Sequence, residues 1–175
     1  MISHGPILSG ATMLEVAIQR EADWPEADWE DIAQTAVAEA IRQAPQSDSW
    51  LTRPLTIEVS IRLTNDAEVQ TLNREYRQKD KPTNVLSFPM VQPDLLEGLT
   101  NSDDGEVLLG DIVLARETCA REAEEKGVAF ADHATHLIVH GTLHLLGFDH
   151  MGDSEAEAME ALERSVLATL GIDDP

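Results

Sequence analysis

Alternation of apolar and polar residues over positions 55–63 is the feature that most constrains the fold of this chain. Polar residues fill the places between the aliphatic members, which are Leu55, Ile57, Val59, Ile61 and Leu63. A period of two residues is typical of a β-strand with one buried face. The sequence therefore predicts a sheet with at least one face covered by other elements.

Strand-like and helical patterns surround this strand. Apolar residues at helical spacing, acids in the first turn and a following proline predict a helix over 28–44. Asn65 with Glu68 three residues later predicts the start of a helix that reaches Tyr76. The remaining segments divide into expected strands over 13–20 (with a short helix as the alternative), 85–89 and 107–115, and expected helices over 116–126, 130–146 and 154–170. We expect one α+β domain in which a mixed sheet of about four strands packs with about five helices, with its metal site on a helix and the following loop.

The length of 175 residues suits a single domain. Residues 1–12 contain no Lys or Arg and no long apolar run, so we expect a loose leader there, no export signal, and the folded domain over 13–175. Cys119 is the only cysteine, which excludes an intramolecular disulfide and is typical of a cytoplasmic protein. Residues 91–106 are rich in Pro, Gly, Asp and Asn and predict a long loop.

The charge of the chain is strongly acidic, with 12 Lys+Arg against 33 Asp+Glu and a net charge of −21. Such a balance normally repels nucleic acid, and solubility or a salt-adapted surface is its simplest explanation. The composition also argues against a membrane span. Four cations nevertheless gather within eight residues, at Arg74, Arg77, Lys79 and Lys81. An anionic ligand would therefore bind locally, at this basic segment.

Histidines form the clearest chemical motif. His136, His140 and His144 are four residues apart and lie on one face of a predicted helix. His140 and His144 can bind one ion together, and Gly147 lets the chain leave the helix and turn back, so that His150 can supply a third imidazole. Three imidazoles with one position open for water are typical of a catalytic zinc site. Imidazole also suits Ni, Cu and Fe.

Two other interpretations of the histidines are less favourable. The spacing is also that of a class of zinc metallopeptidases, but Gly141 stands where those enzymes have the glutamate that acts as general base. A hydrolase would have to generate its nucleophile with the metal alone, or with a group from another segment. A site built on His136 and His140 would begin its turn too late for a third ligand. For His133 and His136 we expect packing or hydrogen bonding behind the ligands.

The basic segment contains the candidate substrate-binding residues. Arg77 is placed to bind a phosphodiester, because its planar guanidinium can hold two phosphate oxygens. We expect Arg77 and the strand over 83–89 to line the groove that holds the metal. The further candidates for substrate contact are Lys79, Lys81, Asn84 and Ser87. So few cations can bind RNA phosphates but recognise little of the RNA base sequence. We therefore expect the choice of substrate to depend on a partner.

Taken together, three segments resemble the YbeY family of bacterial endoribonucleases. They are the segment from Tyr76-Arg77 through Lys79-Asp80-Lys81-Pro82 to Pro89, the segment Leu109-Gly110-Asp111-Ile112, and the segment from His140-Gly141 to Asp149-His150. The similarity runs in order from about residue 55 to residue 172. One departure is Gln78, where the family commonly has glycine.

This resemblance implies an α+β fold with a four-stranded sheet, zinc bound by His140, His144 and His150, and an Arg77 that is important for activity. It also implies trimming of 16S ribosomal RNA, quality control of 70S ribosomes, and contact with a ribosomal protein and GTPase assembly factors. The leading hypothesis is thus a cytoplasmic, zinc-dependent endoribonuclease for single-stranded RNA. The alternatives are a zinc metallopeptidase-like hydrolase and a non-catalytic ribosome assembly factor with structural zinc. A fourth protein ligand on the metal would favour the last.

Overall fold

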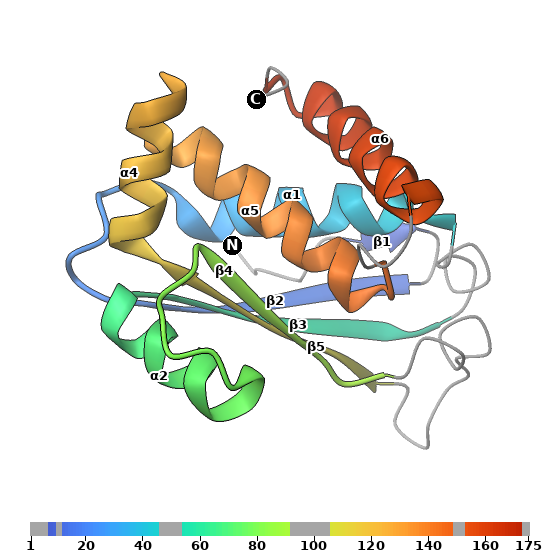
Figure 1. The fold of residues 1–175 in the computed structure, drawn as a ribbon. Coiled ribbons are helices and arrows are strands. Elements are labelled where there is room, and N and C mark those ends of the chain that lie inside the picture. The colour runs from blue at the N-terminus through green and yellow to red at the C-terminus, as the bar shows by residue number, and fades with distance from the viewer. Residues whose placement is uncertain (1–6, 10–11, 46–53, 92–105, 149–152, 173–175) are drawn as a thin grey trace.

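The computed structural model of the protein describes residues 7–9, 12–45, 54–91, 106–148 and 153–172. These residues form one five-stranded sheet and five helices (Figure 1), which confirms the α+β class and the mixed sheet. Within these ranges no helix is long and apolar enough to cross a membrane. Most of the loop predicted over 91–106 lies outside them.

The elements follow the predicted order closely. The strands are β1 (Ile7–Ser9), β2 (Thr12–Arg20), β3 (Thr56–Thr64), β4 (Val85–Pro89) and β5 (Glu106–Ala115). The helices are α1 (Trp29–Gln43), α2 (Asp66–Arg77), α4 (Arg116–Lys126), α5 (Phe130–Leu145) and α6 (Asp153–Thr169). The segment over 13–20 is a strand, so the helical alternative for it is wrong.

The sheet has the strand order β1-β2-β3-β5-β4. Strands β2 and β5 both run parallel to β3, while β1 and β4 are antiparallel to their neighbours. Parallel neighbours need a crossover connection, which α1 provides between β2 and β3. This order leaves β4 at one edge of the described sheet.

Strand β1 lies within residues 1–12, for which the sequence predicts a loose leader. Its backbone pairs with β2, and Leu8 is only 2% exposed and belongs to the main core. A three-residue strand is too short to show an alternating pattern, so its signal is absent from the sequence. The prediction of a loose leader is therefore wrong for residues 7–9, and the sheet has one strand more than expected.

The two faces of the sheet are covered unequally. Figure 1 shows α1, α4, α5 and α6 on one side and α2 on the other. The main core lies on the first side, where Ile57, Val59 and Ile61 of β3 are fully buried. On the second side, a small cluster joins Val69 of α2 to Leu86 and Val113. The helix that carries the histidines, α5, and the helix that leads into the basic segment, α2, therefore pack on opposite faces of the sheet.

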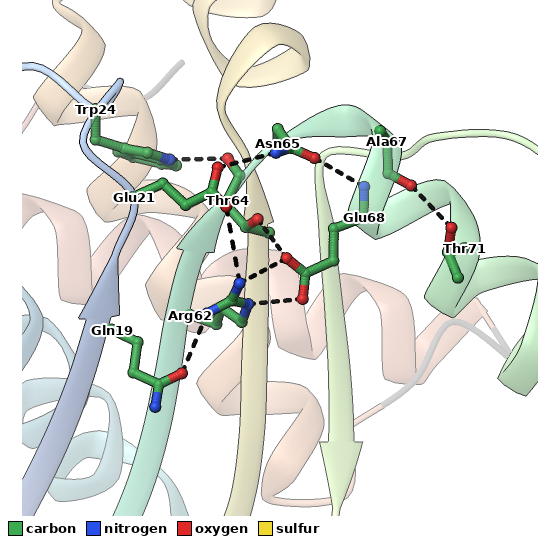
Figure 2. A network of polar contacts seen from close by, with 9 residues as sticks. All are labelled: Gln19, Glu21, Trp24, Arg62, Thr64, Asn65, Ala67, Glu68 and Thr71. Carbon is green, nitrogen blue, oxygen red and sulfur yellow. Dashed lines mark hydrogen bonds and ion pairs between the residues drawn. The ribbon is translucent and has the colours of Figure 1, made fainter.

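A polar network holds the start of α2 against the ends of β2 and β3 (Figure 2). Asn65 caps the helix by accepting a hydrogen bond from the backbone N–H of Glu68 at 2.8 Å. Glu68 directs its carboxylate to Arg62, at 2.6 and 2.8 Å, and to the hydroxyl of Thr64. The predicted helix start is confirmed, and the bidentate ion pair holds the first turn of α2 against β3.

Helix α5 packs directly on the sheet. It contacts β4 and β5 below, and α1 and α6 around it. A Cβ atom added to Gly141 would lie 3.0 Å from Cγ2 of Ile112, so any larger residue would require Ile112 to shift, and glycine allows this close approach of helix and strand without such a shift. The helix ends before Gly147, whose φ of 98° is in the left-handed region, as the sequence predicts.

Candidate active site

His140 and His144 face each other on α5. Their Nε2 atoms are 3.1 Å apart, and their rings meet edge to face with centroids 4.6 Å apart. The side chain of His140 is 24% exposed, so solvent reaches the pair. One turn of helix thus brings two imidazole nitrogens to one point near the surface.

The outer nitrogen of each ring already has an acceptor. Nδ1 of His144 lies 2.8 Å from the backbone oxygen of Phe148, which can only accept, so this nitrogen carries the proton. Nδ1 of His140 lies 2.7 Å from Oε2 of Glu163. Burial alone would raise the pKa of Glu163, but hydrogen bonds from His136 and His140 lower that pKa to about 2, so the group is an ionised acceptor. Each ring therefore turns its Nε2 atom toward the other, and a neutral ring that is protonated on Nδ1 presents a lone pair there.

This arrangement fits a metal ion. Two lone pairs 3.1 Å apart repel each other unless a proton or a cation lies between them. A tetrahedral zinc ion binds imidazole nitrogens at about 2.0–2.1 Å, which separates two of them by about 3.4 Å. The predicted third ligand, His150, lies outside the described residues, and within them no cluster of three His, Cys, Asp or Glu could hold a metal.

His136 and His133 make hydrogen bonds to carboxylates. Nε2 of His136 lies 2.8 Å from Oε1 of Glu163, and Nε2 of His133 lies 2.8 Å from Oε1 of Glu122. Only His136 is connected in this way to a candidate ligand, because Glu163 also contacts His140, while His133 is buried and bound to Glu122. Burial lowers the pKa of His133 more than its contact with Glu122 raises it.

Gly141 has a structural reason to be glycine. Its missing side chain makes room for Ile112 of β5, and the position is buried. A glutamate here would start from a Cβ atom pressed against Ile112 of the sheet. The alternative of a metallopeptidase with its usual general base therefore has no support from the packing.

Arg77 reaches the edge of the sheet from the α2 side. One Nη2 hydrogen atom is donated to the backbone oxygen of Ser87, and the guanidinium lies over the ring of Phe88 at 5.5 Å from its centroid. Ser87 shares a face of β4 with Val85, which packs against the main core beneath α5. Arg77 thus contacts the edge strand β4, whose other face packs beneath α5. That both line one groove stays a prediction.

The other predicted substrate residues differ in their surroundings. Lys79 and Lys81 are exposed, in a loop held by the side-chain amide of Asn73, which donates to the Lys81 backbone oxygen at 2.9 Å. Ser87 is 9% exposed. Asn84 donates its amide to Glu122 at 3.0 Å, a contact that the sequence does not predict. Of these four residues, only Lys79 and Lys81 therefore have exposed side chains, as Arg77 also does.

The comparisons with known proteins agree with these motifs. The family model described as Endoribonuclease YbeY matches residues 16–171. The chain belongs to the YbeY family. The Endoribonuclease YbeY of Rhizorhabdus wittichii is 69% identical over 164 residues, which are 93% of this chain and 96% of that relative. The Endoribonuclease YbeY of Sphingopyxis alaskensis is 64% identical over 164 residues, covering 93% of this chain and 97% of the relative.

A solved structure has a fold similar to that of this chain. A solution structure from Thermotoga maritima covers 90% of this chain and 92% of that chain, with a TM-score of 0.52 and 19% identity. At this identity the likeness concerns the fold alone. The α+β arrangement described above is therefore shared with a protein whose structure was determined experimentally.

Sequence reasoning missed Glu163 and Glu122, the two carboxylates that bind histidines of α5. Glu163 had a readable signal, because it lies on the apolar stripe of α6 that Met159, Val166 and Leu167 form at helical spacing. An acid among core positions indicates a buried partner. Glu122 had no such signal, since the other residues of α4 are largely polar.

Proposed function

We propose that this protein is a zinc-dependent endoribonuclease for single-stranded RNA. We propose further that it trims the 3′ end of 16S ribosomal RNA and takes part in ribosome quality control. The coarse activity is supported by membership of a family described as Endoribonuclease YbeY. The observation that carries the zinc dependence is the pair of Nε2 atoms 3.1 Å apart, with both Nδ1 atoms held by acceptors.

The roles of the residues follow from their chemistry. His140 and His144, with His150 from the following loop, would hold the metal through neutral imidazoles. Zinc held there would supply a bound water with a pKa of about 7 and polarise a phosphate oxygen. Arg77 uses only part of its guanidinium on Ser87, so its remaining N–H groups are left to orient the scissile phosphate. Lys79 and Lys81 attract the RNA backbone beside it.

The acidic surface has a consequence for partners. A net charge of −21 repels RNA except near the basic segment, so affinity for free RNA is low and falls with salt. We therefore include the small ribosomal subunit and ribosome assembly factors as partners that bring the substrate to the site. These partners place the protein in the cytoplasm.

Metal analysis combined with RNA cleavage tests the proposal. The purified protein should contain one zinc ion per chain and cut a single-stranded RNA faster than the same sequence in a duplex. A chelator should abolish cleavage, and added zinc should restore it. Cleavage that persists without metal would overturn the zinc dependence. A protein that binds zinc and ribosomal subunits but cuts no RNA would favour the assembly-factor alternative.

A further inference from the structure

Glu163 joins two histidines of α5 with one carboxylate. Its Oε1 atom lies 2.8 Å from Nε2 of His136, and its Oε2 atom lies 2.7 Å from Nδ1 of His140. The two histidines are one helical turn apart, and α6 supplies the acid from the neighbouring helix. Each carboxylate oxygen therefore has its own imidazole, which prevents the carboxylate from rotating.

The place of Glu163 is unfavourable for a charge. Its residue is 8% exposed, and the neighbouring stripe positions Met159, Val166 and Leu167 are completely buried. Removing a carboxylate from water opposes folding, and an apolar residue of similar size often stabilises such a site more. The packing of α6 on α5 thus does not explain why position 163 is a glutamate instead of an apolar residue.

The contact has a direct effect on a metal-facing nitrogen. Nδ1 of His140 lies 2.7 Å from Oε2 of Glu163, so this contact favours the tautomer with its proton on Nδ1, in which Nε2 faces the partner ring as the lone-pair nitrogen. Fixing the tautomer and the ring plane in this way raises metal affinity in proteins, and loss of such a partner weakens binding about 10–100-fold. His144 is oriented differently, by the backbone oxygen of Phe148, which substitution of a side chain cannot remove.

We propose that Glu163 is a positioning residue, which holds His140 in the metal-binding tautomer, and that His136 serves to fix Glu163. The proposal rests on the zinc site of the proposed function. It assigns roles to an acid and a histidine that do not themselves touch the metal.

Glu122 provides a matched control. Like Glu163, it is a carboxylate on a neighbouring helix that binds a histidine of α5 at 2.8 Å. Its partner His133 is 2% exposed and lies two helical turns from His140. Glu122→Leu therefore removes the same kind of contact from the same helix without touching His140.

Zinc affinity is measured by competition with a coloured chelator for the wild type, Glu163→Leu, Glu163→Gln and Glu122→Leu. Glu163→Leu should bind zinc about 10–100-fold more weakly. Glu163→Gln keeps one acceptor and should recover part of this loss. Glu122→Leu should stay within about threefold of the wild type, even if it lowers the melting temperature of the metal-free protein, because His140 keeps its acceptor.

The tautomer is observed separately in the metal-free protein. Long-range ¹H–¹⁵N correlation spectra should show His140 protonated on Nδ1 in the wild type and in Glu122→Leu, but as a mixture of tautomers in Glu163→Leu. His136→Ala should weaken zinc binding a few-fold, and His136→Gln, whose amide can still donate to Glu163, should restore it.

Two outcomes would overturn the positioning role alone. One is a wild-type zinc affinity and an unchanged His140 tautomer in Glu163→Leu. The other is an equal loss of affinity in Glu122→Leu, which would indicate general packing of α5. A wild-type protein that binds no zinc would instead overturn the proposed function, and this proposal with it.

Discussion

Asn84 donates its side-chain amide to the carboxylate of Glu122, with 3.0 Å between Nδ2 and Oε1. The same oxygen binds Nε2 of His133 at 2.8 Å, so the residue that precedes β4 is connected through α4 to the histidine helix α5. The start of the strand that Arg77 contacts is thereby held in place relative to the helix of the candidate metal site.

Substitution of Asn84 should therefore affect stability. Asn84→Ala leaves a half-buried carboxylate without one of its donors, and we expect a loss of about 1–2 kcal/mol in the free energy of unfolding, measured with urea. Gln70→Ala is the control, because it removes an exposed amide–carboxylate contact with Asp80 and should change stability by less than about 0.5 kcal/mol. Equal effects of the two substitutions would contradict a structural role for Asn84.

Substitution of Arg77 should slow RNA cleavage without affecting zinc binding. Arg77→Ala should leave the zinc content unchanged. It should raise the activation free energy by about 2–4 kcal/mol, which is seen as a lower turnover rate at saturating RNA. Arg77→Lys should recover only part, because an ammonium lacks the planar fork. His144→Ala should lose both zinc and cleavage.

The control for Arg77 is Arg74→Ala. Arg74 is an exposed cation of the same helix end, paired with Asp80 at 3.7 Å. Its loss should change RNA affinity through charge alone and leave the turnover rate near the wild-type value. If Arg77→Ala cleaves RNA at the normal rate with normal zinc, the basic segment is surface charge only.

Gln78 ends α2 in a strained conformation. Its φ of 60° is in the left-handed region, the only positive φ of a non-glycine residue among those described. Gln78→Gly should therefore raise the free energy of unfolding by about 0.5–1 kcal/mol, visible as a higher melting temperature. Gln78→Ala keeps a Cβ atom and should show no such gain. A melting temperature that falls in the glycine variant would argue against strain at this position.

The pairing of Glu68 with Arg62 should make stability depend on pH. The hydrogen bond from Arg62 lowers the pKa of Glu68 in the folded protein, against the opposing effect of burial. A lowered folded-state pKa means that the stabilisation is complete above the unfolded value of about 4.3 and is lost as the pH falls through the folded value. Glu68→Gln should lower stability at neutral pH and flatten this acid dependence. Unfolding curves at several pH values below 6 would measure the difference, and parallel curves for the two proteins would contradict it.

Patterns within short stretches of sequence were sufficient to predict most helices and strands and part of the candidate site. The alternation over 55–63, the helix start at Asn65 and the turn at Gly147 each depend on neighbours within a few residues, and the structure has them where the sequence predicts. The spacing of His140 and His144 is equally local, because one helical turn places both rings on one face. What the sequence by itself determined is therefore the set of elements other than β1, together with the pair of imidazoles.

Contacts between distant segments were decided only by the tertiary structure. Glu163 is 23 residues from His140, and no periodicity links α6 to α5 across that distance. The parallel pairing of β3 with β5 brings Ile112 beneath Gly141, and this fixes how closely α5 can lie on the sheet. The placement of Arg77 at the edge strand β4 likewise follows from the packing of α2. Such contacts form because whole apolar faces are buried together, and that burial is a property of the assembled fold.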